Sequence, residues 1–439
     1  MKRIFSDYAY GPGPREGCWW DETVTLPDQP QLDCDKRTDV AIVGGGFTGL
    51  SAALHLARAG VSVAVVDAHH MGWGASGRNG GFCCLGGGMR SDASLDRQFS
   101  ATARREWRRT EKDAVDRVAA LIDQLNLDVD RHSHGETCLA HRSRDAVGFE
   151  AHARAVQENY GVEPTILSAA DLPGEGLNGP FHGAITVPVG FGLNPRKLLA
   201  GMVAACRAEG VALFDHTPAT SVQPGVVETA HGAVRADRIL ITTNGYSSED
   251  IPTWLAARYM PAQSTVIVTR PLSDVELNQQ GWTSEQMSYD TRHLLHYFRL
   301  MPDRRFLFGM RGGLMAGRSA ECKARQAVMR DFRAMFPGWR DVPIQNAWSG
   351  LVCLSRARVP IIGPIPEAPG VGVALAYHGN GVAMGIHGGA LLADWAVHDE
   401  VDHLPEVSLA PSKPFPLGRL RRAIMPAIYS AFKAADARP

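Results

Sequence analysis

The chain has 439 residues, of which 45% are hydrophobic, and its 45 Lys and Arg nearly balance its 46 Asp and Glu. A chain of this length and apolar content can bury a large core, and we expect it to form two domains. The formal net charge of −1 excludes a strong overall field that would attract nucleic acid or an acidic membrane.

The eight cysteines indicate neither a disulfide framework nor a structural zinc site. Cys83 and Cys84 are adjacent, and no C-x-x-C pair with a matching partner occurs, so we expect no metal. The N-terminal residues lack an apolar signal core, and no stretch approaches about 18 uncharged apolar residues. These features favour a cytoplasmic protein with reduced thiols.

Residues 1–37 are rich in Pro, Gly and Asp and predict an arm that lies over the body of the protein. Residues 38–67 then read as a strand, a glycine turn, a helix and a second strand. The turn carries Gly44, Gly46 and Gly49 at G-x-G-x-x-G spacing, and the second strand ends at Asp67. The glycines allow a tight turn, close approach of a pyrophosphate and close helix packing, while the acid accepts ribose hydroxyls. The motif predicts binding of an ADP-containing dinucleotide at a helix N-terminus.

A glycine-rich segment, residues 71–88, follows directly after this unit. So many glycines indicate backbone that passes against a flat or crowded group. Ser76, Arg78 and Asn79 offer hydrogen-bond donors to phosphate or to the polar edge of a ring. The alternative is a flexible surface loop, which Gly and Ser also favour. The position after a complete nucleotide motif favours a binding segment.

Residues 93–125 carry apolar side chains at helical spacing and predict one long helix. Arg104, Arg105, Arg108 and Arg109 on this helix are either a binding patch or part of a solvated face. The acidic residues between them favour the solvated face.

The remaining elements alternate between two domains. Short strand patterns indicate a second domain with an antiparallel sheet, and a helix at 194–209 with Pro195 in its first turn returns to the nucleotide domain. The expected segments are an arm (1–37), the nucleotide domain (38–136, 193–249 and 346–410), the substrate domain (137–192 and 250–345) and a tail (411–439). The basic, partly apolar tail either packs on the body as a helix kinked by Pro426, which we favour, or lies on a membrane.

The residues at 74–81, Gly-Ala-Ser-Gly-Arg-Asn-Gly-Gly, resemble the flavin-binding segment of the D-amino acid oxidase superfamily, the group of glycine, sarcosine and D-amino acid oxidases. The likeness recurs at residues 241–246, 294–299, 306–309, 348–350, 358–363 and 377–382, so it covers nearly the whole chain. In particular, the chain resembles the gamma-glutamylputrescine oxidase-like proteins of this superfamily.

The resemblance implies an α/β fold, in which a Rossmann-type FAD-binding domain of the glutathione-reductase-like βαβ kind is interleaved with an α+β substrate domain built on an antiparallel sheet. It also implies FAD as the cofactor. The expected FAD-binding residues are Gly44, Gly46, Phe47, Thr48, Gly49, Asp67, Ala75, Ser76, Arg78, Asn79, Gly80, Gly81, Val222, Thr243, Asn244, Gly245, Gly363, Gly379, Asn380, Gly381 and Val382. Among these, Val222 is expected to contact adenine through its backbone.

The glycines at 379 and 381 precede an apolar helical run over 382–395. By the resemblance, the N-terminus of this helix points at the flavin, where its positive dipole end stabilises a reduced, anionic ring. The alternative is that the glycines only make a tight turn.

Sarcosine oxidases of this superfamily attach flavin through a cysteine shortly after a glycine turn in the substrate domain. Here residues 309–313 read Gly-Met-Arg-Gly-Gly, and Cys322 lies farther along in a charged stretch. We therefore expect non-covalent FAD. Relatives often carry Glu where this chain has Asp67, and either acid can reach ribose hydroxyls.

The chemistry that the resemblance implies is oxidation of a C–N bond: hydride passes from the carbon next to nitrogen to flavin N5, and water hydrolyses the imine. The expected pocket residues are His378, Arg299, Tyr297, Arg311 and Gln263. Arg299 or Arg311 either binds a substrate carboxylate or forms a structural ion pair. His378 is the preferred polar group near the reacting centre, whereas His296 is expected to pack in the sheet.

The expected function is FAD-dependent oxidation of a small amine or amino acid, without a nucleic-acid partner. One alternative is a D-amino-acid or N-methyl-amino-acid dehydrogenase with an acceptor other than oxygen; another is a flavin-binding subunit without turnover. No lysine over the flavin is assigned to oxygen activation, so the acceptor, O2 or another, stays open. The glycine-rich segment disfavours a nicotinamide dehydrogenase.

Overall fold

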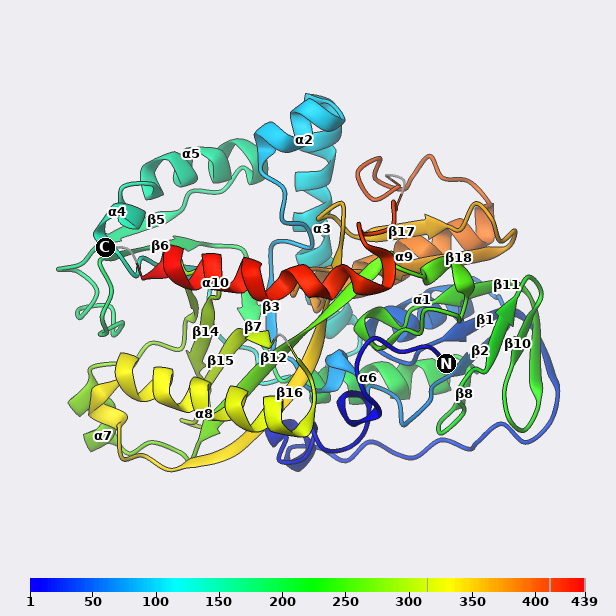
Figure 1. Cartoon of the computed structure of the whole chain (residues 1–439), viewed down its shortest axis with the longest axis horizontal. Coiled ribbons are helices and arrows are strands. Elements are labelled where there is room, and N and C mark those ends of the chain that lie inside the picture. The colour runs from blue at the N-terminus through cyan, green and yellow to red at the C-terminus, as the bar shows by residue number, and fades with distance from the viewer. Residues whose placement is uncertain (314, 410–411, 438–439) are drawn as a thin grey trace.

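The computed structural model describes residues 1–313, 315–409 and 412–437 (Figure 1). Within these residues, two eight-stranded sheets form the body, and the chain passes between them several times. This arrangement confirms the expected fold class of a Rossmann-type domain interleaved with a domain on an antiparallel sheet. The ends of the last two expected segments, at 410–411 and 438–439, lie outside the described residues.

The first sheet carries the nucleotide motif at its centre. Its strands run in the order β17-β18-β11-β1-β2-β8, and the β9–β10 hairpin joins β11. Strands β18, β11, β1, β2 and β8 are parallel, as the fully buried apolar run at residues 40–43 predicts. The bounds are β1 Lys36–Val43, β2 Val63–Val66, β8 Ala212–Phe214, β9 Ser221–Gln223, β10 Val226–Glu228, β11 Ala233–Ile241, β17 Ile361–Pro364 and β18 Val371–Leu375.

Four helices pack beside this sheet: α1 (Phe47–Arg58), α3 (Ala101–Gln124), α6 (Pro195–Ala208) and α9 (Ala383–His398). Glycine allows α1 and α9 to approach closely, because a Cβ atom at Gly389 would lie 2.2 Å from the Thr48 carbonyl oxygen. The expected helix at 194–209 is confirmed as α6. Asn194 caps it by accepting the N–H groups of Arg196 and Lys197, and Pro195 stands in its first turn.

The second sheet runs in the order β16-β12-β15-β14-β13-β4-β6-β5 and is antiparallel except for the β4–β13 pair. Its bounds are β4 Glu136–Leu139, β5 Thr165–Ser168, β6 Gly183–Val187, β12 Tyr259–Thr269, β13 Met287–Asp290, β14 His296–Leu300, β15 Phe306–Gly313 and β16 Ile344–Ser355. The expected segment boundary at 345–346 therefore falls inside β16. A separate pair joins β3 (Phe82–Cys84) to β7 (Gly190–Gly192).

Helix α8 (Arg318–Met335) covers one face of the second sheet, below the centre of Figure 1. An aromatic core that includes Phe298, Phe306 and Phe332 joins the two. This core packs α8 against the second sheet, including strands β14 and β15. The smaller helices are α4 (Ser143–Ala146), α5 (Phe149–Tyr160) and α7 (Asp274–Gln280).

The prediction of one helix over 93–125 is wrong, because α2 (Asp92–Gln98) ends before α3 begins. Ser100 caps α3 and accepts the Ala103 N–H at 3.0 Å, which fixes the start of α3 and so separates it from α2. Both alternatives for the arginines are wrong at Arg104, which is buried and pairs with Asp96 of α2 and Glu158 of α5. Arg108 likewise pairs with Asp92 and Glu111, so these two arginines tie neighbouring helices together.

The tail packs on the body, as we favoured. Helix α10 (Met425–Asp436) buries Met425 and Tyr429 against Met260, and Arg421 is buried in an ion pair with Glu249. Pro426 stands in the first turn of α10, so the expected kink inside a helix is wrong. Among the described residues, no helix combines the length and apolar character that crossing a bilayer requires.

Candidate functional site

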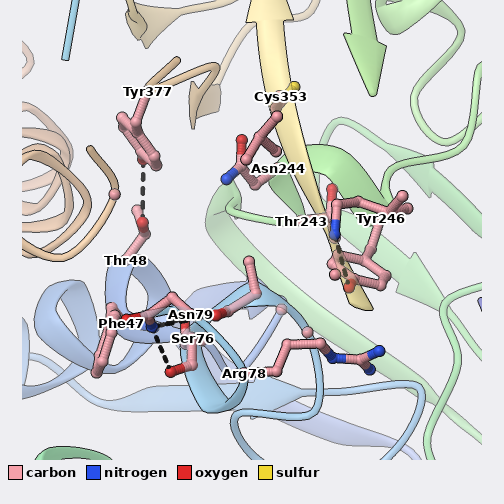
Figure 2. Close-up of a pocket in the computed structure, with 18 of the residues that line it drawn as sticks. Phe47, Thr48, Ser76, Arg78, Asn79, Thr243, Asn244, Tyr246, Cys353 and Tyr377 are labelled. Atoms are coloured by element: carbon pink, nitrogen blue, oxygen red, sulfur yellow. Dashed lines mark hydrogen bonds between the residues drawn. The ribbon is translucent and has the colours of Figure 1, made fainter. Parts of the chain in front are cut away.

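A cavity of about 440 Å³ lies between the two sheets. The carboxyl ends of β1, β2 and β11 form one wall, and strands β12, β14 and β15 form the opposite one. Figure 2 shows the glycine-motif helix and the segment around Ser76 facing the loops of Asn244 and Tyr377 across it. Ligands of parallel sheets bind at this edge, outside the carboxyl ends of the strands.

The glycine turn has the geometry that the motif predicts. Gly44 has φ +108°, a value that favours glycine. A Cβ atom at Gly49 would lie 1.9 Å from the Gly44 carbonyl oxygen, so only glycine lets α1 pack this close to the turn. Gly46 faces the cavity, where a Cβ atom would lie 2.8 Å from the Ser76 hydroxyl oxygen.

Asp67 lies at the end of β2 and lines the cavity. Its carboxylate accepts the Gly45 N–H at 2.8 Å and the His69 N–H at 2.9 Å, which fixes its orientation. Burial nevertheless raises the pKa of Asp67 to about 6. A ligand that brings hydroxyl donors, as a ribose does, would stabilise this carboxylate.

The segment after Asp67 lines the cavity, but two of its polar side chains are already engaged in the protein. The Arg78 guanidinium donates to the carbonyls of Trp73 and Ser349, and the Asn79 amide donates to those of Ala75 and Ser76. They hold the turn rather than offer free donors. Ser76 accepts the Phe47 N–H at 2.9 Å and so lies at the N-terminus of α1 (Figure 2).

Two loops of the first domain close the cavity. Thr243 and Asn244 line it after β11, where the Asn244 side chain accepts the Ala376 N–H at 3.0 Å. Residues 379–382 line it at the N-terminus of α9, and the predicted helix there is confirmed. The N-termini of α1 and α9 thus both face the cavity, and both favour negative charge on a ligand. Thr48 in the first turn of α1 and Tyr377 in the loop before α9 share a 3.0 Å hydrogen bond (Figure 2).

Most of the expected cofactor positions come together at the cavity. Those that line it are Gly44, Gly46, Phe47, Thr48, Asp67, Ala75, Ser76, Arg78, Asn79, Gly80, Thr243, Asn244, Gly379, Asn380, Gly381 and Val382. Gly49, Gly81, Gly245 and Gly363 do not line it. Val222 is buried in the apolar core of the first domain, and Thr217, Pro218 and Ala219 line the cavity in its place.

Three of the five expected pocket residues line the cavity: Tyr297, Arg311 and His378. The Tyr297 ring fits against two glycines, because Cβ atoms at Gly80 and Gly309 would lie 2.8 and 2.1 Å from its atoms. The Arg311 guanidinium donates to the Asn380 side chain at 3.3 Å.

His378 has φ +53° and binds Ser355 through Nε2 at 3.2 Å, while its Nδ1 is buried without a partner among the described residues. Burial lowers the pKa of His378 to about 4, so the ring is neutral at physiological pH. A neutral ring offers hydrogen bonding but no charge to a ligand.

Arg299 and Gln263 do not reach the cavity, in contrast to the expectation for both. Arg299 is fully buried, donates to the Leu193 carbonyl at 2.8 Å and contacts His132 Nε2 at 3.0 Å. Gln263 donates to Glu321 of α8. Gln263 thus joins β12 to α8, whereas Arg299 joins β14 to the chain beside the β3–β7 pair. His296 is buried against Asp290, as expected for a packed histidine.

The cavity also contains residues that sequence reasoning missed. Glu136 of β4 and Tyr289 of β13 line it from the second sheet, and Arg3 and Tyr10 line it from the arm. In the structure, the side chains of residues 136–139 alternate in burial, which places Glu136 on the face opposite to Thr137 and Leu139. Nothing local in the arm identifies Arg3.

The residues present fit FAD. The cavity offers a glycine turn, two helix N-termini, a carboxylate just after β2 and a broad wall that includes Tyr297. An anionic dinucleotide with a flat ring matches these features.

Comparisons with known proteins agree with this geometry. The family model of the FAD dependent oxidoreductases (DAO) matches residues 39–395. The chain is 29% identical to a probable oxidoreductase OrdL of Rhizobium meliloti (strain 1021), over 93% of this chain and 94% of that protein. It is 28% identical to the gamma-glutamylputrescine oxidoreductase of Escherichia coli (strain K12), over 90% of this chain and 91% of that protein.

Solved structures share the fold. Glycine oxidase from Bacillus cereus ATCC 14579 has a TM-score of 0.68 at 18% identity, with 84% of this chain and 98% of that chain covered. Iminodiacetate oxidase from Chelativorans sp. BNC1 has a TM-score of 0.68 at 21% identity, with 85% and 98% covered. Because the family model spans most of the chain and the cavity fits its cofactor, the protein belongs to the DAO family of FAD-dependent oxidoreductases.

Proposed function

We propose that this FAD-dependent oxidoreductase of amines and amino acids acts on a carboxylate-bearing amine of the gamma-glutamylputrescine type. The observation that carries the proposal is that Arg311 and Tyr297 line the same cavity as the glycine turn and Asp67. The likeness to gamma-glutamylputrescine oxidoreductase over about nine-tenths of both chains supports this substrate class.

Arg311 would bind the substrate carboxylate. Its guanidinium lines the cavity next to the loop that precedes α9, and a planar fork matches a carboxylate in geometry and charge. Arg78 has its nitrogens on backbone carbonyls, so it is less suited to this role. A bound carboxylate at Arg311 would orient the rest of the amine along the wall formed by Tyr297.

FAD, when bound, supplies the hydride acceptor for the carbon next to nitrogen. Asp67 would hold its ribose, and the N-terminal amides of α1 would hold its phosphates. Those of α9 would stabilise negative charge on the ring. The residues of the second sheet then position the substrate and exclude water from it.

Non-covalent attachment of FAD is part of the proposal. The cysteines that line the cavity are Cys84 and Cys353, and burial raises the pKa of both thiols, that of Cys353 to about 12. Cys322 is exposed on α8 and does not line the cavity. Thiols of this kind do not react readily with a flavin, so acid precipitation of the protein should release free FAD.

The function is tested by anaerobic mixing of the holoenzyme with gamma-glutamyl amines, polyamines, N-methyl amino acids and D-amino acids. Absorbance at about 450 nm reports reduction of the cofactor. We expect gamma-glutamyl amines to bleach it fastest. Bleaching by N-methyl or D-amino acids alone would contradict the substrate class and favour the dehydrogenase alternative, and readmitted air then tests whether oxygen is the acceptor.

A further inference from the structure

The cavity holds two carboxylates among the described residues, Asp67 and Glu136. Asp67 lies in the first domain, and backbone N–H groups orient it at the place expected for the cofactor ribose. Glu136 comes from the opposite side, at the start of β4 in the second sheet. The proposed function uses Asp67 and leaves Glu136 without a role.

Glu136 faces the cavity because of the pleat of β4. Glu136 and Cys138 are half-buried, whereas Thr137 and Leu139 between and after them are fully buried. Tyr289 of the parallel neighbour β13 pairs directly with Cys138 of β4, and it also lines the cavity. This face of the second sheet therefore presents a carboxylate and a phenol to the ligand.

No cation neutralises Glu136 within ion-pair distance among the described residues. Burial raises the pKa of Glu136 to about 7, and the Cys84 hydrogen bond and the Arg311 charge oppose this rise only in part. A buried carboxylate without a cationic partner is unfavourable in the charged form. A ligand that brings its own positive charge removes this cost.

Arg311 and Glu136 together give the substrate end of the cavity one positive and one negative group. The carboxylate of the proposed substrate requires the first, and its amine, which is protonated in water, matches the second. Resting on the proposed function, we propose that Glu136 receives the ammonium group of the substrate and takes one of its protons. The step converts R-NH3⁺ and a carboxylate into R-NH2 and a carboxylic acid, so it needs no further reagent.

The proton transfer to Glu136 prepares the amine for loss of hydride. Loss of hydride from the carbon next to nitrogen is assisted by the nitrogen lone pair, which an ammonium group lacks. A proton acceptor beside the amine thus provides the reactive form, and a group whose pKa lies near the working pH accepts and returns a proton most effectively. Glu136 becomes such an acceptor only above about pH 7.

The other titratable groups around Glu136 do not change charge in this range. They are Cys84 of β3, Cys138 of β4 and Tyr289 of β13, whose pKa values are all raised, that of Cys138 to about 12 by burial. The charge on a Cys138 thiolate and burial together raise the pKa of Tyr289. Arg311 of β15 brings a guanidinium group to the same cavity. Asp67 also lines the cavity, and burial raises its pKa to about 6, so an acidic limb reports Glu136 only if the Glu136→Gln substitution removes it.

The test compares the Glu136→Gln holoenzyme with the wild type between pH 5 and 10. The measurement is anaerobic reduction of the flavin by the amine that bleaches the wild type fastest. We expect the rate constant divided by the substrate Kd to fall on the order of 10²-fold at pH 8. The acidic limb near pH 7 should disappear, while the flavin content stays at the wild-type level. Glu136→Asp, which keeps a carboxylate, should retain the limb.

Glu285→Gln is the matched control, because Glu285 is exposed and lies two residues before β13, outside the cavity. It should behave as the wild type. A Glu136→Gln enzyme that keeps both the wild-type rate and the acidic limb would overturn the inference alone. Loss of flavin from this variant would also overturn it, because Glu136 would then hold the cofactor. A wild-type flavin that no amine reduces would overturn the proposed function itself, and the inference with it.

Discussion

Two arginines on neighbouring strands illustrate how single residues acquire different roles. Arg299 of β14 is buried and contacts the Leu193 carbonyl and His132, which lie beside the β3–β7 pair and outside the second sheet. Arg311 of β15 lies at the cavity. Tyr297, Arg299 and Arg311 share one face of the sheet, because Tyr297 pairs with Gly309 and alternate residues of a strand point the same way. Of the two arginines only Arg311 lines the cavity, so we assign the proposed carboxylate-binding role to it.

Arg311→Ala tests this role. We expect the KM for a carboxylated amine to rise about 10- to 100-fold, because a charge-assisted bidentate contact is lost. The KM for the matching amine without the carboxylate should change less than about twofold, since that contact never formed. Steady-state or anaerobic kinetics with the two amines provide the comparison in one variant. An equal rise for both amines would contradict the role.

Gly379 controls the space that Arg311 occupies. Its φ is +106°, and a Cβ atom there would lie 2.3 Å from Arg311 Nη2. Gly379→Ala should displace the guanidinium and raise the KM for the carboxylated amine about tenfold. Gly161→Ala is the control, because Gly161 also has a positive φ, +66°, but nothing lies within 4 Å of its Cβ position. Identical kinetics of the two variants would show that Gly379 serves only the turn.

Some residues of the candidate site could be predicted from the sequence, and others could not. The glycines at 44, 46 and 49 were predictable because their roles depend on a turn within one short segment. Arg299 was misassigned because the backbone near Gly81 and Leu193 covers it, although it shares the face of Tyr297. Gln263 was misassigned because the face of a strand depends on partners far away in the sequence. Glu136 was missed for the same reason: its neighbours at the cavity come from β3, β13 and β15.

At the scale of elements, the N-terminus of α1 is the clearest link between local sequence and function. Gly46 precedes the helix, lines the cavity and packs against Ser76. Gly46→Val should abolish bound flavin, because its side chain would occupy the approach of the pyrophosphate and displace Ser76. The ratio of flavin to protein absorbance measures this loss. Gly60→Ala, beyond the other end of α1 and in open space, should stay yellow. A fully yellow Gly46→Val enzyme would contradict the role of the motif.

The arm lies over the body, as expected, and it also contributes to the cavity. It is anchored by hydrogen bonds from Lys2 to Ser248, from Arg15 to Trp73 and from Trp20 to Asn79. Arg3 lines the cavity, and its Nε is buried without a hydrogen-bond partner among the described residues. An anionic cofactor would provide that partner.

Arg3→Ala should therefore weaken FAD binding. We expect the Kd to rise about tenfold, which corresponds to the loss of about 1.4 kcal/mol. Titration of apoprotein with FAD, followed by quenching of flavin fluorescence, measures this constant. Arg37→Ala is the control, because the Arg37 side chain is 80% exposed and pairs only with Asp237 on the surface. Equal affinities in the two variants would restrict the arm to a structural role.

For the whole molecule, the interleaved order of segments was predictable because each return to the nucleotide domain carries its own motif. The contribution of the arm to the cavity and the strand that runs through the expected boundary at 345–346 were not, since both depend on contacts between distant segments. The cavity lies where these contacts meet: β1, β2 and β11 form one wall, β12, β14 and β15 the other, and the arm a third. One bound molecule would therefore contact both sheets and the arm at once.

This arrangement predicts that FAD stabilises both domains together. At a free FAD concentration of 100 times the Kd, binding to the native state alone adds about 2.7 kcal/mol to the free energy of unfolding. Thermal unfolding should therefore move to higher temperature as FAD is added, in a single transition that involves both sheets. Hydrogen exchange should slow in β1 of the first sheet and in β14 of the second to a similar degree. Two transitions, of which FAD moves only one, would mean that the cofactor is held by one domain, and the second sheet would then serve the substrate alone.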